Sequence, residues 1–258
     1  MKDKMAKLKS RLSEFSISFS DFEAHLKEMD SSISLAYMSS FDNLGGKSSD
    51  IDVYIIGSKK PELLLKEKNT HFVGMFTIGE LLIDLEFWPE DYIRKLLKED
   101  YTKFEEEELK LLQKLSAAVI ITNTCEGSEL INAIDKAKLG EVVKKIYREK
   151  ANSYLDDGIK LLGDCYEELA LICAREALQF TIGEINASKG KINLKYKWIM
   201  RIFEDNGGYG NVDNVVKYKT YMLDIPDRGC SLRPYVEEII DFISMLRTRE
   251  IGLFSDMF

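Results

Sequence analysis

The hydrophobic periodicity of this sequence changes close to Pro89, and that change constrains the fold more than any other feature. Between residues 31 and 88, apolar residues occur in short β-prone runs, whereas from Tyr92 onward they recur every three to four residues. Alternation by two is typical of a strand, and recurrence near 3.6 is typical of a helix. The pattern therefore predicts an α+β protein, with a sheet-containing domain over residues 1–100 and an all-helical domain over residues 101–258.

Four β-prone runs carry the first domain, and Gly79-Glu80 between the last two is typical of a hairpin turn. The predicted strands span residues 31–37, 51–56, 72–78 and 81–88, after a predicted helix over residues 10–29. Further helices are predicted over residues 91–98, 104–118, 127–135, 139–163, 165–188, 195–204 and 234–247. The segment 165–188 is the most hydrophobic of these, and we expect it to form the core of a helical bundle.

Carboxylates are abundant in this chain and histidines are scarce. The 258 residues include 44 Asp and Glu, 36 Lys and Arg, and only two histidines, and the net charge is −8. Two histidines are too few for a multi-histidine metal site, so metal chemistry should use oxygen ligands, as for Mg²⁺ or Mn²⁺. The negative charge also disfavours general binding of nucleic acid, and it suits a cationic small-molecule substrate.

The amino-terminal residues and the cysteines favour a cytoplasmic protein. The segment MKDKMAKLKSRLSEF carries a charge every two or three residues and lacks the apolar core of a signal peptide. No window approaches the ~20 apolar residues of a membrane span, so no membrane partner is expected. The four cysteines contain no C-x-x-C pair, and we expect them to be buried or free thiols in a reducing compartment.

Two pairs of acidic residues occur at the same spacing in two predicted strands. Each pair brackets one apolar residue: Asp50 and Asp52 in one strand, Asp84 and Glu86 in the other. Residues two apart in a strand point to the same face, so the carboxylates of each pair would project together, roughly 7 Å apart. Two adjacent strands would then present up to four carboxylates on one face of the sheet.

Such a cluster of like charges is unfavourable unless cations neutralise it. Three carboxylates at the end of a sheet can hold two divalent ions about 3.5–4 Å apart, an arrangement that serves phosphoryl and nucleotidyl transfer. The alternative is structural, because a half-exposed strand also alternates acidic and apolar residues to remain soluble.

The stretch before the first acid pair resembles the signature of the DNA polymerase β nucleotidyltransferase superfamily. That signature is Gly-Ser, ten residues, Asp-x-Asp, and a third acid on a later strand. Here it reads Met38-Ser39, ten residues, and the tripeptide Asp-Ile-Asp that begins at Asp50. The flanks are similar to the small-molecule branch, the aminoglycoside nucleotidyltransferases. The resemblance is specific over residues 33–58 and looser over residues 72–88.

One position departs from that signature. Met38 stands where the family has glycine, which lets the backbone approach the phosphates closely. An alternative is therefore a catalytically degenerate protein with this fold, which acts by binding a partner.

The resemblance implies a mixed-sheet nucleotidyltransferase domain and a definite reaction. Two Mg²⁺ ions, or Mn²⁺, and a nucleoside triphosphate, with ATP as the default, would bind. The nucleoside monophosphate would pass to an acceptor hydroxyl with release of pyrophosphate. The branch implies a small-molecule acceptor such as an aminoglycoside, and a protein hydroxyl or a tRNA end is the alternative.

Roles for the acids follow from the same resemblance. Asp50 and Asp52 would hold the metal ions, and a third acid would complete the site or take the proton from the attacking hydroxyl. Asp84 is preferred as this third acid because it lies in the middle of its strand. Glu86, nearer to the break at Pro89, remains the alternative.

Roles for the phosphate contacts follow in the same way. The triphosphate would lie at Ser39, with Ser40 and Ser49 alongside. In the helical domain, Lys197 follows a polar turn and by family analogy would touch the triphosphate or the base; the alternative is a position on a solvated helix face. Some enzymes of this kind are dimers that share an active site, so an oligomer is one of the expected states of this protein.

Overall fold

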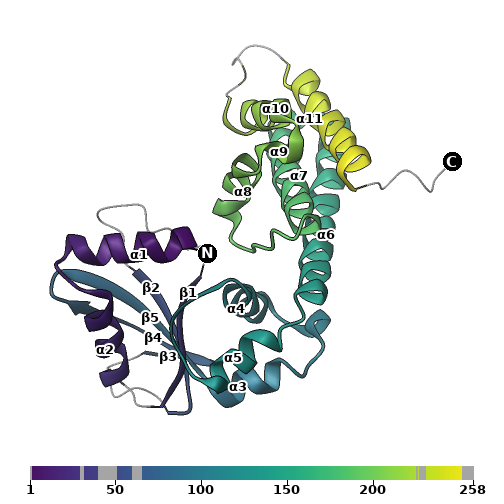
Figure 1. Cartoon of the computed structure of the whole chain (residues 1–258). Helices are drawn as coiled ribbons and strands as arrows, with labels where there is room; N and C mark the ends of the chain where they lie inside the picture. Colours follow the sequence, from purple (N-terminus) through teal and green to yellow (C-terminus); the bar gives the residue numbers. More distant parts are fainter. Residues whose placement is uncertain are drawn as a thin grey trace. The chain divides into compact units, whose positions relative to one another are not determined.

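The computed structural model describes residues 2–29, 32–39, 51–59, 66–224, 226 and 231–251 (Figure 1). The chain divides into two compact units, Met1–Lys136 and Ala137–Phe258. The first unit contains a β-sheet and the second consists of helices, which confirms the predicted α+β class. The division falls after Lys136 and not near residue 100, because a further strand and its flanking helices follow residue 100 and belong to the sheet unit.

The first unit is built on a mixed sheet, six-stranded in the part of the chain that is described. The strand order is β3-β4-β5-β2-β1-β6. β2 and β5 are parallel, and every other neighbouring pair is antiparallel. The strands are β1 (Ile33–Ser39), β2 (Ile51–Gly57), β3 (Lys66–Lys68), β4 (His71–Ile78), β5 (Leu81–Pro89) and β6 (Ala118–Asn123).

The four predicted strands all occur, with small shifts at their ends. β4 and β5 form the expected hairpin, in which Thr77 pairs with Leu82. Gly79 in the turn has φ +59°, a left-handed conformation that glycine adopts without the steric cost of a Cβ. The hairpin therefore follows from local sequence.

Helices α1 (Lys2–Glu14) and α2 (Phe19–Met29) cover one face of the sheet (Figure 1). The sequence predicted a single helix over residues 10–29, and this prediction was wrong. The chain breaks at Ser16, where φ is +59°. It restarts at Ser18, whose hydroxyl accepts a hydrogen bond from the N–H three residues on, because serine satisfies the free N–H groups of a helix start.

The core between these helices and the sheet uses one set of alternate strand residues. Leu12 from α1 and Phe22 from α2 are fully buried against it. The sheet contributes Ile51, Val53 and Ile55 from β2 and Ile83, Leu85 and Phe87 from β5. The other alternate residues, which include the acids, therefore face away from α1 and α2.

Strand β6 was not predicted from the sequence. It pairs with β1 in a register that joins Leu35 to Asn123, and so extends the sheet with residues distant in the chain. The helices around it belong to the same unit: α3 (Glu90–Leu96), a 3₁₀ turn (Tyr101–Lys103), α4 (Glu106–Ser116) and α5 (Cys125–Asn132).

The second unit is helical throughout its described residues. Its long helices are α6 (Lys136–Gly163) and α7 (Glu167–Ser188), and α7 packs against α8, α10 and α11. The expectation that the segment 165–188 forms the core is met, since α7 is buried from Ala177 to Ala187. The remaining elements are a 3₁₀ turn (Tyr196–Trp198), α8 (Ile199–Asp205), α9 (Gly207–Gly210), α10 (Val212–Leu223), α11 (Arg233–Leu246) and a π-helical turn (Arg247–Ile251).

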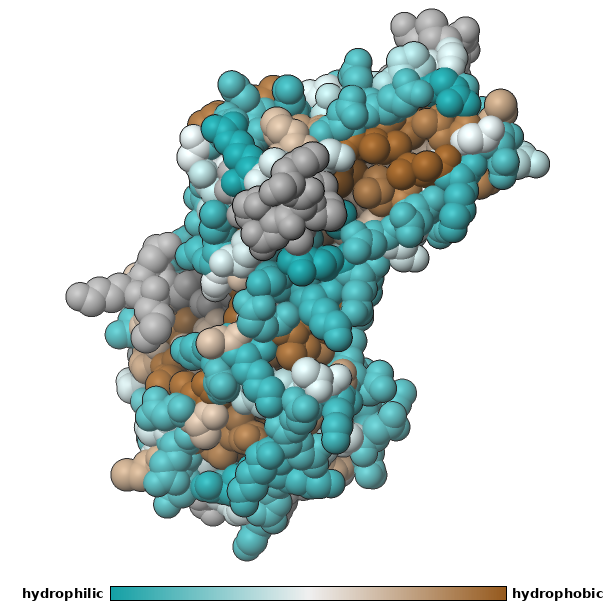
Figure 2. All heavy atoms as spheres, turned by 90° about the vertical axis from the view of Figure 1, so that its right-hand side faces the viewer, coloured by the Kyte–Doolittle hydropathy of each residue, from teal (hydrophilic) through white to brown (hydrophobic). Residues whose placement is uncertain are grey.

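Apolar side chains also reach the surface of the second unit (Figure 2). Ile159, Leu169 and Ile172 are each at least half exposed. The oligomeric state stays a prediction. Within the described ranges, none of the helices combines the length and the apolar character that a membrane crossing requires.

Candidate functional site

The acids that the sequence singled out meet on one face of the sheet. The parallel register of β2 and β5 pairs Asp52 with Asp84 and Tyr54 with Glu86. Paired residues of neighbouring strands share a face and lie about 4.8 Å apart. Asp52 and Asp84, both half-buried, therefore form a pair of adjacent carboxylates, with Glu86 next to them along β5.

Ser39 belongs to the same row across the sheet. The antiparallel register of β1 and β2 pairs Tyr37 with Tyr54, and continuing it by two residues places Ser39 beside Asp52. The row therefore runs from Ser39 on β1 through Asp52 on β2 to Asp84 on β5. Ser39 is only 1% exposed, so the serine lies inside the fold at the end of β1.

Met38 points to the opposite face. Its side chain is fully buried in the core cluster that includes the residues of α1 and α2. The side chain of the methionine that replaces the motif glycine therefore packs in the hydrophobic core. It does not lie on the face of the sheet that carries Asp52.

Glu86 is held by two donors. Lys114 of α4 places Nζ 2.9 Å and 3.2 Å from its two carboxylate oxygens, and the indole Nε1 of Trp88 donates to it at 2.7 Å. The same ammonium lies 4.3 Å from the centroid of the Tyr54 ring. The side chains of Lys114 and Glu86 are 13% and 21% exposed, so this ion pair is largely shielded from solvent.

Trp88 extends these contacts towards α3. Its ring stacks on His71 at 4.2 Å and on Tyr92 at 5.7 Å between centroids. Burial lowers the pKa of His71, and the Glu86 carboxylate opposes part of that shift. His71 therefore favours its uncharged form more than a free histidine does, and it serves as part of an aromatic stack.

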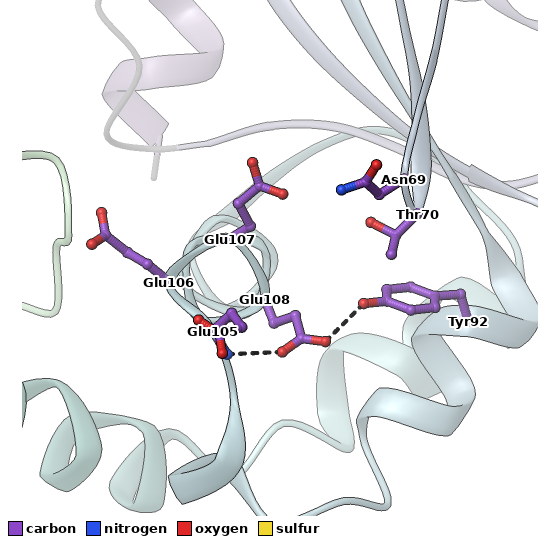
Figure 3. A pocket seen from close by; sticks show the side chains of 7 residues that line it. All are labelled: Asn69, Thr70, Tyr92, Glu105, Glu106, Glu107 and Glu108. Carbon is purple, nitrogen blue, oxygen red and sulfur yellow. Dashed lines mark hydrogen bonds between the residues drawn. The ribbon is translucent and has the colours of Figure 1, made fainter.

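An acidic pocket of about 390 Å³ opens at the start of α4 (Figure 3). Glu108 accepts hydrogen bonds at 2.9 Å from both the Glu105 N–H and the Tyr92 hydroxyl. Burial and this bond raise the pKa of Tyr92 to about 12. The carboxylates make the pocket negatively charged, and Glu108 also has a structural role in starting the helix. The pocket is lined by Asn69, Thr70, Tyr92, Glu105, Glu106, Glu107 and Glu108.

Three of the predicted site residues, Ser40, Ser49 and Asp50, lie outside the described residues. Within the described part, no three or more His, Cys, Asp or Glu side chains are grouped to hold a metal ion. Asp52 and Asp84 nevertheless supply adjacent carboxylates, and Mg²⁺ is commonly bound by one or two carboxylates together with substrate phosphates. The chemistry of these two side chains fits such an ion.

Lys197 belongs to the second unit. It is exposed in the 3₁₀ turn Tyr196–Trp198, with Nζ 5.5 Å from the Trp198 ring centroid. The predicted helix over residues 195–204 is thus divided into this turn and α8. Lys197 lines a pocket of about 190 Å³ with Gln179, Tyr196, Met200, Tyr218, Met222 and Leu223. Its contact with a nucleotide stays a prediction.

Lys114 was not singled out in the sequence. The sequence feature that could have indicated a paired lysine is its spacing: Lys114 lies three residues after Leu111, which is buried on the apolar side of α4. A lysine on such a side must pair its charge or extend to solvent. Its partner Glu86 lies 28 residues away, so only the tertiary structure identifies the pair.

Comparison with known proteins gives similarity in fold to solved structures. No protein-family model matches the chain, and no curated protein matches it. Among solved structures, the chain is similar to a nucleotidyltransferase-like protein from Exiguobacterium sibiricum, with 12% sequence identity and a TM-score of 0.47. The alignment covers 93% of this chain and 74% of that chain. The fold class of this chain accordingly rests on its own structure, a mixed-sheet unit followed by a helical unit.

Proposed function

We propose that the protein is a Mg²⁺-dependent nucleotidyltransferase that moves a nucleoside monophosphate, AMP from ATP, onto an acceptor hydroxyl and releases pyrophosphate. The observation that supports this proposal is the register of β2 and β5, which brings Asp52 and Asp84 side by side. The register of β1 and β2, continued by two residues beyond the pair of Tyr37 and Tyr54, adds Ser39 to this row. A row of a hydroxyl and two carboxylates suits the binding of a phosphate and its cation.

The metal-binding residues in this proposal are Asp50, Asp52 and Asp84. Divalent ions bound there would neutralise the charge of the phosphates. The side chains of the protein bind and orient the triphosphate and the acceptor, and Asp84 is our choice for the group that accepts the acceptor's proton. No covalent nucleophile is needed.

The phosphate contacts in this proposal are Ser39, Ser40 and Ser49, with Lys197 as a further contact. A hydroxyl and backbone N–H groups at the end of a strand can donate to phosphate oxygens.

The acceptor in this proposal is a cationic small molecule, such as an aminoglycoside. The net charge of −8 and the acidic pocket at the start of α4 support this choice, because both attract cations. A protein hydroxyl and a tRNA end are the alternative acceptors, and a screen of the three classes separates them.

A second candidate is a nucleotidyltransferase-fold protein without activity that acts by binding. The presence of Met38 in place of the motif glycine favours it. Mg²⁺-dependent binding of ATP without transfer to any acceptor would favour this candidate over the enzyme.

The decisive test is thermal unfolding with each common nucleoside triphosphate, with and without Mg²⁺, on wild type and Asp52→Asn. A ligand at a hundredfold its Kd stabilises the native state by about 2.7 kcal/mol, or roughly 5–10 °C for a protein of this size. We expect such a shift for one nucleotide in the presence of Mg²⁺, and its loss in Asp52→Asn.

The matched control is Asp91→Asn, which removes an exposed carboxylate from α3 of the same unit and should keep the full shift. Pyrophosphate release with an acceptor present should fall at least about a hundredfold in Asp52→Asn. Wild-type turnover in that variant would exclude the proposed site.

A further inference from the structure

We propose that Glu86 is a counter-charge for Lys114 and not a metal ligand, and that Lys114 is a positioning residue that keeps Glu86 out of the cation site formed by the other acids of this face. This inference rests on the proposed function, because it concerns the cation site of that reaction. It also decides between the two candidates for the third acid.

Both oxygens of Glu86 are already engaged. The ammonium of Lys114 lies 2.9 Å and 3.2 Å from them, and the Trp88 indole donates to one of them at 2.7 Å. A divalent ion that approached this carboxylate would meet the positive charge of Lys114 at close range. Glu86 is therefore a poor ligand while Lys114 is in place.

Lys114 is itself fixed in position. Its neighbours Leu112 and Leu115 on α4 are fully buried, so the helix is anchored to the unit. The ammonium rests over the Tyr54 ring at 4.3 Å, and the side chain is only 13% exposed. A cation held over an aromatic face and against a carboxylate has little freedom to move away.

The distribution of charge follows from these contacts. Asp52, Asp84 and Glu86 carry three negative charges on one face, and Lys114 cancels that of Glu86. The acids proposed to hold the ion include Asp52 and Asp84, which are adjacent through the pairing of β2 and β5. Glu86 lies roughly 7 Å from Asp84 along β5, close enough for its compensation to affect a bound ion.

Charge variants of the pair have opposite expected effects on cation binding. Lys114→Met uncovers the charge of Glu86 and should tighten Mn²⁺ binding by about tenfold. Glu86→Gln leaves Lys114 uncompensated and should weaken Mn²⁺ binding by about tenfold. The double variant restores the balance of charge, so its affinity should return to within about threefold of wild type.

The experiment is a titration of the full chain with Mn²⁺ in the absence of nucleotide. The concentration of free Mn²⁺ is measured by electron paramagnetic resonance. Lys114→Arg keeps the charge and should bind as wild type does. Lys27→Met is the matched control, because Lys27 pairs with Glu23 at 2.7 Å on α2, away from the face of the acids; it should leave the affinity unchanged. Asp84→Asn should lose binding.

The outcomes separate the inference from the proposed function. Binding that is lost in Glu86→Gln and stays lost in the double variant makes Glu86 a ligand; this overturns the inference and leaves the function standing. Absence of Mn²⁺ binding to wild type overturns both. If Lys114→Met does not fold, Glu86→Gln decides alone, since it keeps the acceptor for Trp88: a tenfold weakening supports the inference and complete loss contradicts it.

Discussion

At the residue scale, one carboxylate of the second unit is buried among arginines. Glu184 in α7 is fully buried, with Oε1 2.5 Å from Nε of Arg148 and Oε2 3.8 Å from Nη2 of Arg247. Burial lowers the pKa of Arg247, and the charge of Glu184 opposes that shift. Removing one member of such a group leaves the others buried without compensation.

We expect Glu184→Gln to lower the free energy of unfolding by about 2–4 kcal/mol, because Arg247 would then be buried without a counter-charge. Urea unfolding measures this change. Glu149→Gln on α6 is the control, since its pair with Lys145 is 3.8 Å long and exposed; it should change the free energy by less than about 0.5 kcal/mol. Equal effects of the two variants would contradict a role for the buried group.

His71 predicts a dependence of stability on pH. Its pKa is lowered in the native state by burial, so the native state binds fewer protons there than the unfolded chain does. The stability that this difference provides is present above the ordinary histidine pKa of about 6.5 and is lost as the pH falls below it. His71→Phe should therefore flatten the fall in unfolding free energy between about pH 7 and pH 5. The exposed His25→Gln should follow the wild-type curve, and a His71→Phe curve of the wild-type slope would exclude this origin.

At the element scale, the β4–β5 hairpin sets the position of the third acid. Its turn fixes the register that pairs Met75 with Asp84, and β5 then pairs Asp84 with Asp52. A change of one residue in this register would turn Asp84 to the other face. The turn conformation of Gly79 thus helps to determine the face of the sheet on which Asp84 lies.

We expect Gly79→Ala to lower the free energy of unfolding by about 1 kcal/mol, because a Cβ is strained at φ +59° even though no atom lies within 4 Å of it. Gly163→Ala at the end of α6 meets equally open space without a positive φ, and it should be neutral or stabilise by up to about 0.5 kcal/mol. Thermal unfolding of both variants measures the difference. A destabilised Gly163→Ala with an unaffected Gly79→Ala would contradict the argument.

At the scale of the whole molecule, the chain forms two compact units that divide after Lys136. The sheet unit extends to Lys136, because β6 pairs with β1 and the leucines of α4 are buried. A fragment that ends at residue 100 would expose one side of β1 and the surface that α4 covers.

We expect a fragment of residues 1–136 to fold with dispersed amide resonances, and a fragment of residues 1–100 to be largely unfolded or aggregated. An unpaired β1 edge and uncovered apolar surface favour association. Heteronuclear NMR and light scattering measure both properties. A folded, monomeric 1–100 fragment would show that β6 and α4 are dispensable.

The sequence by itself determined the elements whose signals are local. The alternation in the segment 51–56, the turn at Gly79 and the apolar periodicity of the segment 165–188 each predicted an element that the structure contains, because the residues that set φ, ψ and burial lie within a few positions of one another. The same alternation showed that Asp84 and Glu86 share a face.

Only the tertiary structure decided which strands are neighbours and which charges are paired. β6 joins the sheet through β1, and Asp52 meets Asp84 through a parallel pairing across 32 residues. The contact of Lys114 with Glu86 and Tyr54 likewise has no local signature. Non-local pairing depends on the packing of all elements at once, so the sequence supplied the acids and the fold determined their neighbours.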